Sequence, residues 1–138
     1  MFPTKKQKRR FKIDSKKLAL IVVEAAEDKK GEDIIVLDMR PIPSFCEYFV
    51  IISAGSLRQV NAVSDAVQYA LIKEKIKPFS TISSNDESGW IVLDYASVVA
   101  HIFYKPVREF YALEHLWSDA KKVRIKKKPA PKTKRKPL

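Results

Sequence analysis

The chain has 138 residues, a formal net charge of +11 and a single cysteine. That length fits about one domain, which can bury roughly two-thirds of the surface of its unfolded chain. Cys46 alone cannot form an internal disulfide, which fits a reducing compartment, and no apolar run approaches the ~20 residues of a membrane-spanning helix. The opening MFPTKKQKRR lacks the apolar segment of a secretory signal and is too lysine-rich for a typical transit peptide, so we expect a cytoplasmic protein.

The positive charge is concentrated at the two ends of the chain. Residues 1–17 contain eight basic residues and one acidic residue, and residues 121–138 contain ten basic residues and none that are acidic. Residues 18–120 contain nine basic and fifteen acidic residues, a net charge of −6. The sequence therefore predicts an acidic domain over 18–120 between two basic tails, which repulsion between like charges keeps disordered. Such tails bind polyanions such as RNA through counterion release, or serve only to keep the protein soluble.

The first part of the domain predicts a helix followed by two strands. Leu18–Lys30 has apolar residues at helical spacing, and Gly31 is expected at the C′ position that ends this helix. Short apolar runs predict strands at Ile34–Asp38 and Glu47–Ser53, with a proline-containing loop over 41–44 between them.

A second helix is predicted to begin after Ser56. Ser56 and Gln59 have the spacing of a capping box, and an apolar stripe then continues to about Lys75. The segment Phe79–Ser83 predicts a short edge strand, and residues 84–89 predict a polar turn.

The richest strand signal is Gly89–Phe103, with the sequence GWIVLDYASVVAHIF. Its two apolar runs, Trp90–Leu93 and Val98–Phe103, predict an antiparallel hairpin in the middle of a sheet. A final helix is expected from Pro106 to about residue 121, with an apolar stripe made by Phe110, Leu113 and Trp117. The fold class is therefore α/β or α+β, a mixed sheet of about five strands flanked by helices.

The strand-to-helix segment Ala54-Gly55-Ser56 could hold a phosphate, because the amides at a helix start attract anions. It resembles the Gly-Ser opening of nucleotidyltransferase folds. Those enzymes also need paired carboxylates for Mg²⁺, and no Asp-x-Asp or Glu-x-Asp pair lies on a candidate strand. A structural turn with a helix cap is therefore favoured over catalysis.

Other combinations of reactive residues are weak. Asp94 and His101 could exchange a proton across the hairpin, but the sequence offers no matching nucleophile, and facing residues often pair for structural reasons. Metal binding normally needs three or four ligands at defined spacing, which His115 and Asp119 do not supply. We expect no enzyme activity, no cofactor and no metal.

Aromatic residues are numerous in the domain. Phe103 and Trp117 fit core packing best. Trp90 and Tyr95 flank an acidic residue at the edge of the hairpin and are as well suited to be surface anchors as core residues, because aromatics are enriched at interface hot spots.

Four segments, taken in chain order, form a specific set although each alone is modest. They are Gly31-x-Asp33-Ile34 through Leu37-Asp38; Tyr48-Phe49-Val50-Ile51 with Ala54-Gly55-Ser56-x-Arg58-Gln59-Val60; Gly89-Trp90-Ile91-Val92-Leu93-Asp94-Tyr95 with Val98-Val99-x-His101-Ile102-Phe103; and Arg108-Glu109-Phe110-Tyr111-x-Leu113-Glu114-x-Leu116-Trp117. As a set they resemble the ribosomal silencing factor family, also called the Iojap-related family, over about residues 16–118. Glu47 stands where this family usually has Asp, which keeps the charge.

The resemblance implies a nucleotidyltransferase-like fold without known nucleotidyl transfer. It implies a protein that binds the large ribosomal subunit through the fourteenth protein of that subunit, blocks joining with the small subunit, represses translation, and is a homodimer when free. The alternatives are a nucleotidyltransferase-like enzyme and an RNA-binding module that depends on the tails.

If the resemblance holds, the hairpin and the final helix form the docking surface for the ribosomal protein. The residues expected on it are Trp90, Asp94, Tyr95, His101, Phe103 and Arg108. Trp90 and Tyr95 would supply buried apolar area, and Asp94 would pair with a basic residue of the partner. Contacts to ribosomal RNA are expected from the carboxy-terminal tail, at Lys126, Lys127, Lys128, Lys134 and Arg135.

Overall fold

The computed structural model describes residues 14–42, 46–83 and 88–125. Several predicted features lie outside these ranges: residues 1–13 of the first tail, Pro43 and Ser44 of the loop, residues 84–87 of the polar turn, and residues 126–138 with their five expected RNA contacts. The elements in chain order are α2 (Ser15–Asp28), β1 (Glu32–Asp38), β2 (Tyr48–Ala54), α3 (Leu57–Ile72), β3 (Ser80–Ser83), β4 (Trp90–Asp94), β5 (Val98–Tyr104), α4 (Lys105–Tyr111), α5 (Leu113–Leu116) and β6 (Lys121–Val123).

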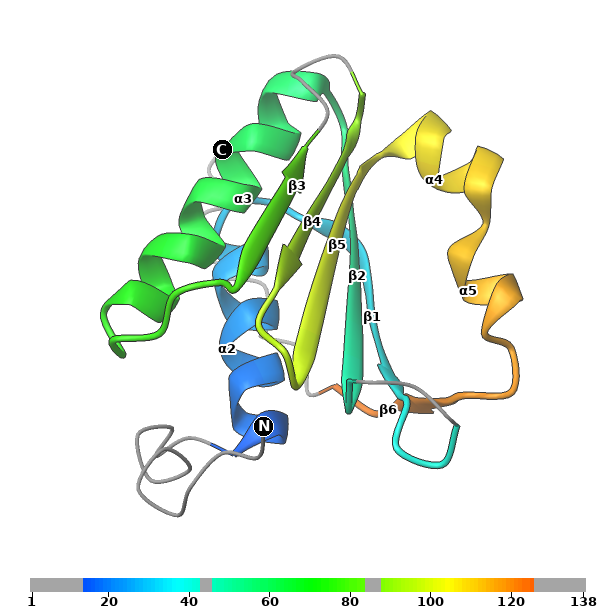
Figure 1. The fold of residues 1–138 in the computed structure, drawn as a ribbon. Coiled ribbons are helices and arrows are strands. Elements are labelled where there is room, and N and C mark those ends of the chain that lie inside the picture. Colours follow the sequence, from blue (N-terminus) through cyan, green and yellow to red (C-terminus); the bar gives the residue numbers. More distant parts are fainter. Residues whose placement is uncertain (1–13, 43–45, 84–87, 126–138) are drawn as a thin grey trace, which may run out of the picture.

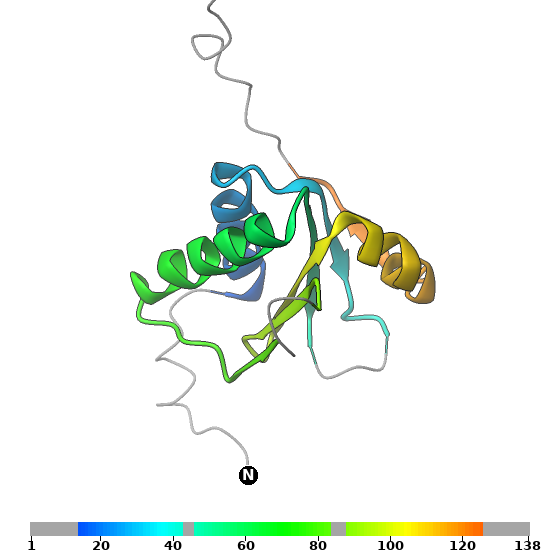
Figure 2. The same cartoon turned by 90° about the horizontal axis from the view of Figure 1, so that it is seen from above.

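The described strands form one six-stranded sheet in the order β3-β4-β5-β2-β1-β6. Neighbouring strands are antiparallel, except that β2 and β5 are parallel, so the predicted mixed sheet is confirmed. The predicted hairpin is β4 and β5, with Trp90 opposite Phe103, and β3 is an edge strand as expected. Helices α2 and α3 cover one face of the sheet, and α4 and α5 lie against the other (Figure 1, Figure 2).

The sixth strand was not predicted. Lys121–Val123, assigned to the disordered tail, forms β6 and pairs with residues 36–38 of β1. The carboxy-terminal boundary of the domain therefore lies beyond residue 120. Two of the three residues of β6 are exposed lysines, so no apolar alternation indicates a strand, and the pairing depends on an edge that β1 provides.

The starts and ends of the first two helices follow from local chemistry. Ser56 caps α3 as predicted, because its Oγ accepts a hydrogen bond from the backbone N of Gln59 at 3.1 Å. At the end of α2, the left-handed position is occupied by Lys30, with φ of 65°, and not by Gly31. Gly31 is required for a different reason, since a Cβ there would lie 2.9 Å from Cγ2 of Ile52.

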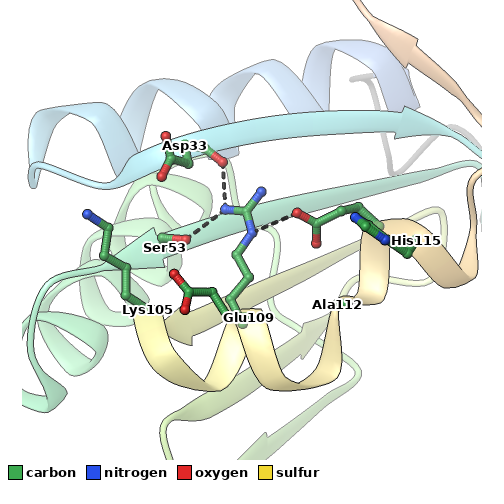
Figure 3. A pocket seen from close by; sticks show the side chains of 8 residues that line it. Asp33, Ser53, Lys105, Glu109, Ala112 and His115 are labelled. Atoms are coloured by element: carbon green, nitrogen blue, oxygen red, sulfur yellow. Dashed lines mark hydrogen bonds and ion pairs between the residues drawn. The ribbon is translucent and has the colours of Figure 1, made fainter.

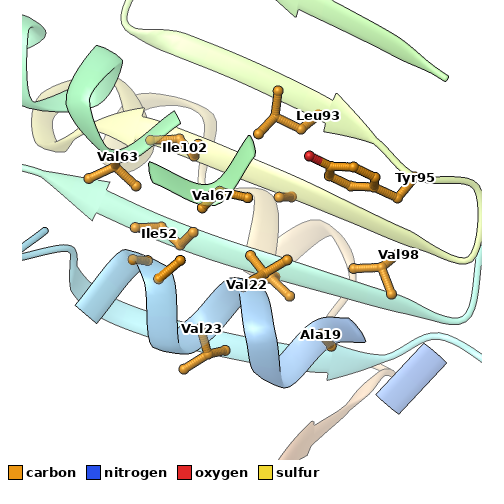
Figure 4. Packing of buried hydrophobic residues seen from close by; sticks show 14 of the residues in the cluster. Ala19, Val22, Val23, Ile52, Val63, Val67, Leu93, Tyr95, Val98 and Ile102 are labelled. Carbon is orange, nitrogen blue, oxygen red and sulfur yellow. The ribbon is translucent and has the colours of Figure 1, made fainter. Parts of the chain in front are cut away.

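Each face of the sheet has its own apolar core. The larger cluster lies between the sheet and helices α2 and α3 and is made by side chains that alternate along the strands (Figure 4). The smaller cluster lies on the opposite face, under α4, α5 and the loop before β2. Its buried members are Leu37, Met39, Cys46, Ile51, Val99, Phe103, Leu113 and Ala120.

The predicted final helix is interrupted. Pro106 lies in the first turn of α4 as expected, but the helix ends at Tyr111, because Ala112 adopts left-handed backbone angles of 46° and 50°. The short helix α5 then continues in a new direction (Figure 1). The break divides the predicted stripe: Leu113 and Trp117 pack against the smaller cluster, whereas 80% of Phe110 is exposed.

Candidate functional site

The structure does not bring the six predicted docking residues to one exposed surface. Four of them share the sheet face on which α4 and α5 lie. On that face Trp90 and Asp94 are partly exposed, whereas His101 and Phe103 are buried. The other two, Tyr95 and Arg108, are buried elsewhere in the domain.

Tyr95 belongs to the core under α2 and α3, where only 5% of it is exposed (Figure 4). Tyr95 follows Ile91 and Leu93 at every second position, and all three belong to this core, so strand alternation places Tyr95 on the face covered by α2 and α3. The chain then turns at Ala96, which has a φ of 71°. Burial raises the pKa of its hydroxyl to about 12. The interpretation of Tyr95 as a surface anchor is therefore wrong.

Asp94 supports the turn of the hairpin. Its Oδ1 accepts a hydrogen bond from the backbone N of Ala96 at 2.8 Å. Asp94 lies opposite Val99 in the sheet, while His101 lies opposite Val92, so the two residues do not face each other across the hairpin. An Asp94–His101 proton-transfer pair, disfavoured from the sequence, has no support from this register.

The central feature of this face is a row of four aromatic rings, which we call the aromatic row: Phe103, Trp90, Tyr111 and Phe110. The ring of Trp90 stacks on Phe103 with centroids 4.8 Å apart and lies 4.9 Å from the ring of Tyr111. Tyr111 in turn meets the edge of Phe110 at 5.1 Å. The row thus extends from the buried core to solvent, where 52% of Tyr111 and 80% of Phe110 are exposed.

Sequence reasoning missed Phe110, Tyr111 and the neighbouring Leu116 as surface residues. Leu116 is 72% exposed and lies on α5, the helix that follows Phe110 and Tyr111 in the chain. A continuous helix would have buried Phe110 on its apolar stripe, and the break at Ala112 has no glycine to indicate it. The only available signal was the density of aromatic residues in the final helix.

His101 lies beneath Trp90 and is 7% exposed. Its Nδ1 accepts a hydrogen bond from the indole Nε1 of Trp90 at 3.2 Å, and the edge of Phe49 packs on the imidazole at 4.7 Å. An accepting Nδ1 requires the proton on Nε2, which is buried without a partner in the part of the chain that the structure describes. Burial without a compensating charge lowers the pKa of His101 to about 4.

We expect this histidine to make the protein less stable in mild acid. Below about pH 6.5 the unfolded state takes up a proton that folded His101 accepts only near pH 4, so the free energy of unfolding falls as the pH decreases across this window. The expected loss is up to about 3 kcal/mol. Urea unfolding at pH 7 and pH 4.5 measures it, and a His101→Leu variant should lose clearly less. Equal losses in both proteins would contradict the assignment.

Arg108 is a buried connector at one end of the sheet. Its Nη1 donates to the carbonyl oxygen of Asp33 at 2.6 Å and to Oγ of Ser53 at 2.7 Å, and its Nε donates to Oε2 of Glu114 at 3.2 Å (Figure 3). The guanidinium therefore attaches α4 to β1, β2 and α5. Only 8% of Arg108 is exposed. The prediction that Arg108 faces a partner is therefore wrong.

A cavity of about 420 Å³ lies beside this guanidinium, where the parallel strands β2 and β5 end. Its lining is mixed in charge: Asp33, Ser53, Lys105, Arg108, Glu109, Ala112, Glu114 and His115 (Figure 3). The side chains of Lys105 and Arg108 already have partners, since Lys105 pairs with Glu32 at 2.8 Å. Within residues 14–42, 46–83 and 88–125, no group of three or more acidic, histidine or cysteine side chains could hold a metal ion.

The Gly55-Ser56 segment serves as a helix cap in this structure. Besides the Ser56 cap described above, a carboxylate lies close by: Oε2 of Glu32 would be 4.0 Å from a Cβ on Gly55. This carboxylate is paired with Lys105, so a side chain of the protein already lies beside this helix start. The described helices also include none that is both long and apolar enough to span a bilayer.

Comparison with known proteins gives consistent matches. The family model described as "Ribosomal silencing factor during starvation" matches residues 12–137. The ribosomal silencing factor RsfS of Bacillus subtilis is 34% identical over 108 residues, which are 78% of this chain and 91% of that protein. The mouse "Mitochondrial assembly of ribosomal large subunit protein 1" is 30% identical over 100 residues, 71% of this chain and 44% of that protein. A crystal structure of a Chromobacterium violaceum protein aligns with a TM-score of 0.72 and 29% identity, covering 86% of this chain and 92% of the other.

Proposed function

Because the chain belongs to the ribosomal silencing factor family, we propose that it represses translation by binding the large ribosomal subunit through the fourteenth protein of that subunit. A protein bound there covers surface that the small subunit needs, and the two subunits cannot join. The action is steric and takes place in the cytoplasm. Of the two relatives described above, one is named as a silencing factor and the other for assembly of the large ribosomal subunit.

The aromatic row is the observation that supports this proposal most. Aromatic side chains that join a buried core to solvent are the usual anchors of protein interfaces, because they supply large contact area at low entropic cost. Trp90 and Tyr111 are in contact, and Tyr111 is half-exposed and meets the more exposed Phe110. A partner that packs on them would bury this apolar area.

Charge favours a basic partner. Residues 18–120 have a net charge of −6, and the partly exposed Asp94 lies on the same face of the sheet as Trp90. In the proposed interface Asp94 pairs with a Lys or Arg of the ribosomal protein. His101, Phe103 and Arg108 support the surface from behind, and Tyr95 has no part in it.

The direct test is subunit reassociation on sucrose gradients. Purified large and small subunits are mixed with a molar excess of the full-length protein, and the joined ribosome peak is compared with that of a mixture without it. The proposal expects the protein to sediment with the large subunit and the joined peak to shrink. Subunits that recombine equally well in its presence would contradict it.

The tails make a separate contribution to the proposed binding. Truncation after Ile125 removes seven basic residues but keeps β6, so the domain stays complete. We expect weaker binding to large subunits and a flatter dependence of log K on log salt, by about 0.7–0.9 for each phosphate that the tail no longer neutralises. Sedimentation at about 50, 100 and 200 mM salt measures the slope. An unchanged slope would mean that the tail does not touch RNA.

Two further expectations rest on the family resemblance alone. They are the likeness to nucleotidyltransferase folds and the homodimeric state of the free protein. Both stay predictions, and light scattering on the purified protein tests the second.

A further inference from the structure

We propose that His101 is a positioning residue, which fixes the indole of Trp90 in the orientation that the partner meets. This inference rests on the proposed function and names the residue that prepares its main anchor. The orientation of the Trp90 ring is a property of the free protein, and its effect on affinity is a property of the complex. The two are therefore measured separately.

The hydrogen bond between these side chains is directional, whereas the other contacts of the indole are not. Trp90 Nε1 donates to His101 Nδ1 at 3.2 Å, while Phe103 and Tyr111 only stack or tilt against the ring. A partly exposed indole held by stacking alone can rotate and slide on its neighbours. The bond to His101 selects one ring orientation.

The imidazole is itself held in place. It is buried against Phe49, whose ring meets it edge-on, and lies nearly parallel to Phe103 at an interplanar angle of 12°. Val92 lies opposite His101 on the neighbouring strand, so Trp90 reaches it diagonally, two residues along β4. A rigid acceptor on a central strand defines a direction better than one on a loop.

Packing alone does not explain a histidine at this position. Its Nε2 proton is buried without a partner among the described residues, and a leucine would fill the space without that unpaired donor. What a leucine lacks is the acceptor for Trp90. The nitrogen that is used, Nδ1, is therefore the functional part of the side chain.

Two variants separate positioning from packing. His101→Leu removes the acceptor together with the unpaired donor, whereas His101→Asn places an amide oxygen close to the position of Nδ1. Three measurements are made on the full chain: the indole N–H resonance of Trp90, the urea midpoint, and the affinity for purified large subunits. A Trp117→Phe sample serves only to assign the two indole resonances.

We expect His101→Leu to shift the Trp90 indole resonance, to leave the urea midpoint equal or higher, and to weaken binding about tenfold. His101→Asn should keep the resonance near its original position and bind within about threefold of the original protein. Two results would overturn the role of His101 and leave the proposed function intact. One is that the His101→Leu variant binds large subunits as tightly as the original protein, and the other is that its Trp90 indole resonance does not shift. If the original protein does not bind large subunits at all, the proposed function fails and this inference fails with it.

Discussion

Replacing Arg108 with methionine is expected to lower the free energy of unfolding by about 3–5 kcal/mol. Methionine keeps much of the apolar stem but removes three hydrogen bonds, which join α4 to the carbonyl of Asp33, the hydroxyl of Ser53 and the carboxylate of Glu114. The Glu114 carboxylate is then left partly buried, with a side-chain exposure of 26%, and without its ion-pair partner. A buried charge that has lost its partner costs far more than the pair contributed. Urea or thermal unfolding at pH 7 measures the loss.

Lys105→Met is the matched control, because it makes the same kind of change on the same helix. Lys105 pairs with Glu32 at 2.8 Å, but both side chains are about half exposed, at 48% and 47%. We expect a loss of less than about 1 kcal/mol, as for other exposed ion pairs. If both variants lose the same stability, Arg108 is not the connector that the structure indicates.

The second large effect is expected in binding. Tyr111→Ala removes the ring that links the partly exposed Trp90 to Phe110 and should weaken the association with large subunits about 30-fold or more, as at other aromatic hot spots. Tyr111 is 52% exposed, so the fold should lose little stability. Co-sedimentation with a concentration series of subunits gives the affinity, and urea unfolding checks the fold.

Tyr69→Ala is the control for this binding experiment. Tyr69 is also an exposed tyrosine, at 65%, but it lies on α3, which covers the opposite face of the sheet (Figure 1). Its removal should leave the affinity within about twofold. A loss of affinity with Tyr69→Ala and none with Tyr111→Ala would place the docking surface on the face covered by α2 and α3 instead.

Local signals predicted most of the fold. Ser56 was found because a cap acts within one turn of its own helix, and β4 and β5 were found because β-branched runs are strand-forming wherever they lie. The sequence could not predict β6, since two exposed lysines in Lys121–Val123 carry no apolar pattern. That strand exists because β1 has a free edge, which only the assembled sheet shows.

The site was harder to predict because its key contacts join distant residues. The sequence alone predicts that Arg108 is a charged surface residue. Its burial depends on Asp33 and Ser53, which lie 75 and 55 positions away in the chain. Tyr95 was placed in the polar break of the hairpin, whereas in the structure it continues the buried alternation of Ile91 and Leu93. Spacing could have indicated Tyr95, but no local pattern reports the burial of Arg108; Trp90 lies on the strand where it was expected.

The pairing of β6 with β1 has a consequence for synthesis of the protein (Figure 1). It joins the last strand of the domain to the first, so a nascent chain keeps one side of β1 unpaired until Lys121–Val123 have left the exit tunnel. An unpaired strand edge is a template for aggregation, and chaperones that bind nascent chains would protect it during this interval. This edge of β1 is therefore covered only after residues 121–123 have been synthesised and released.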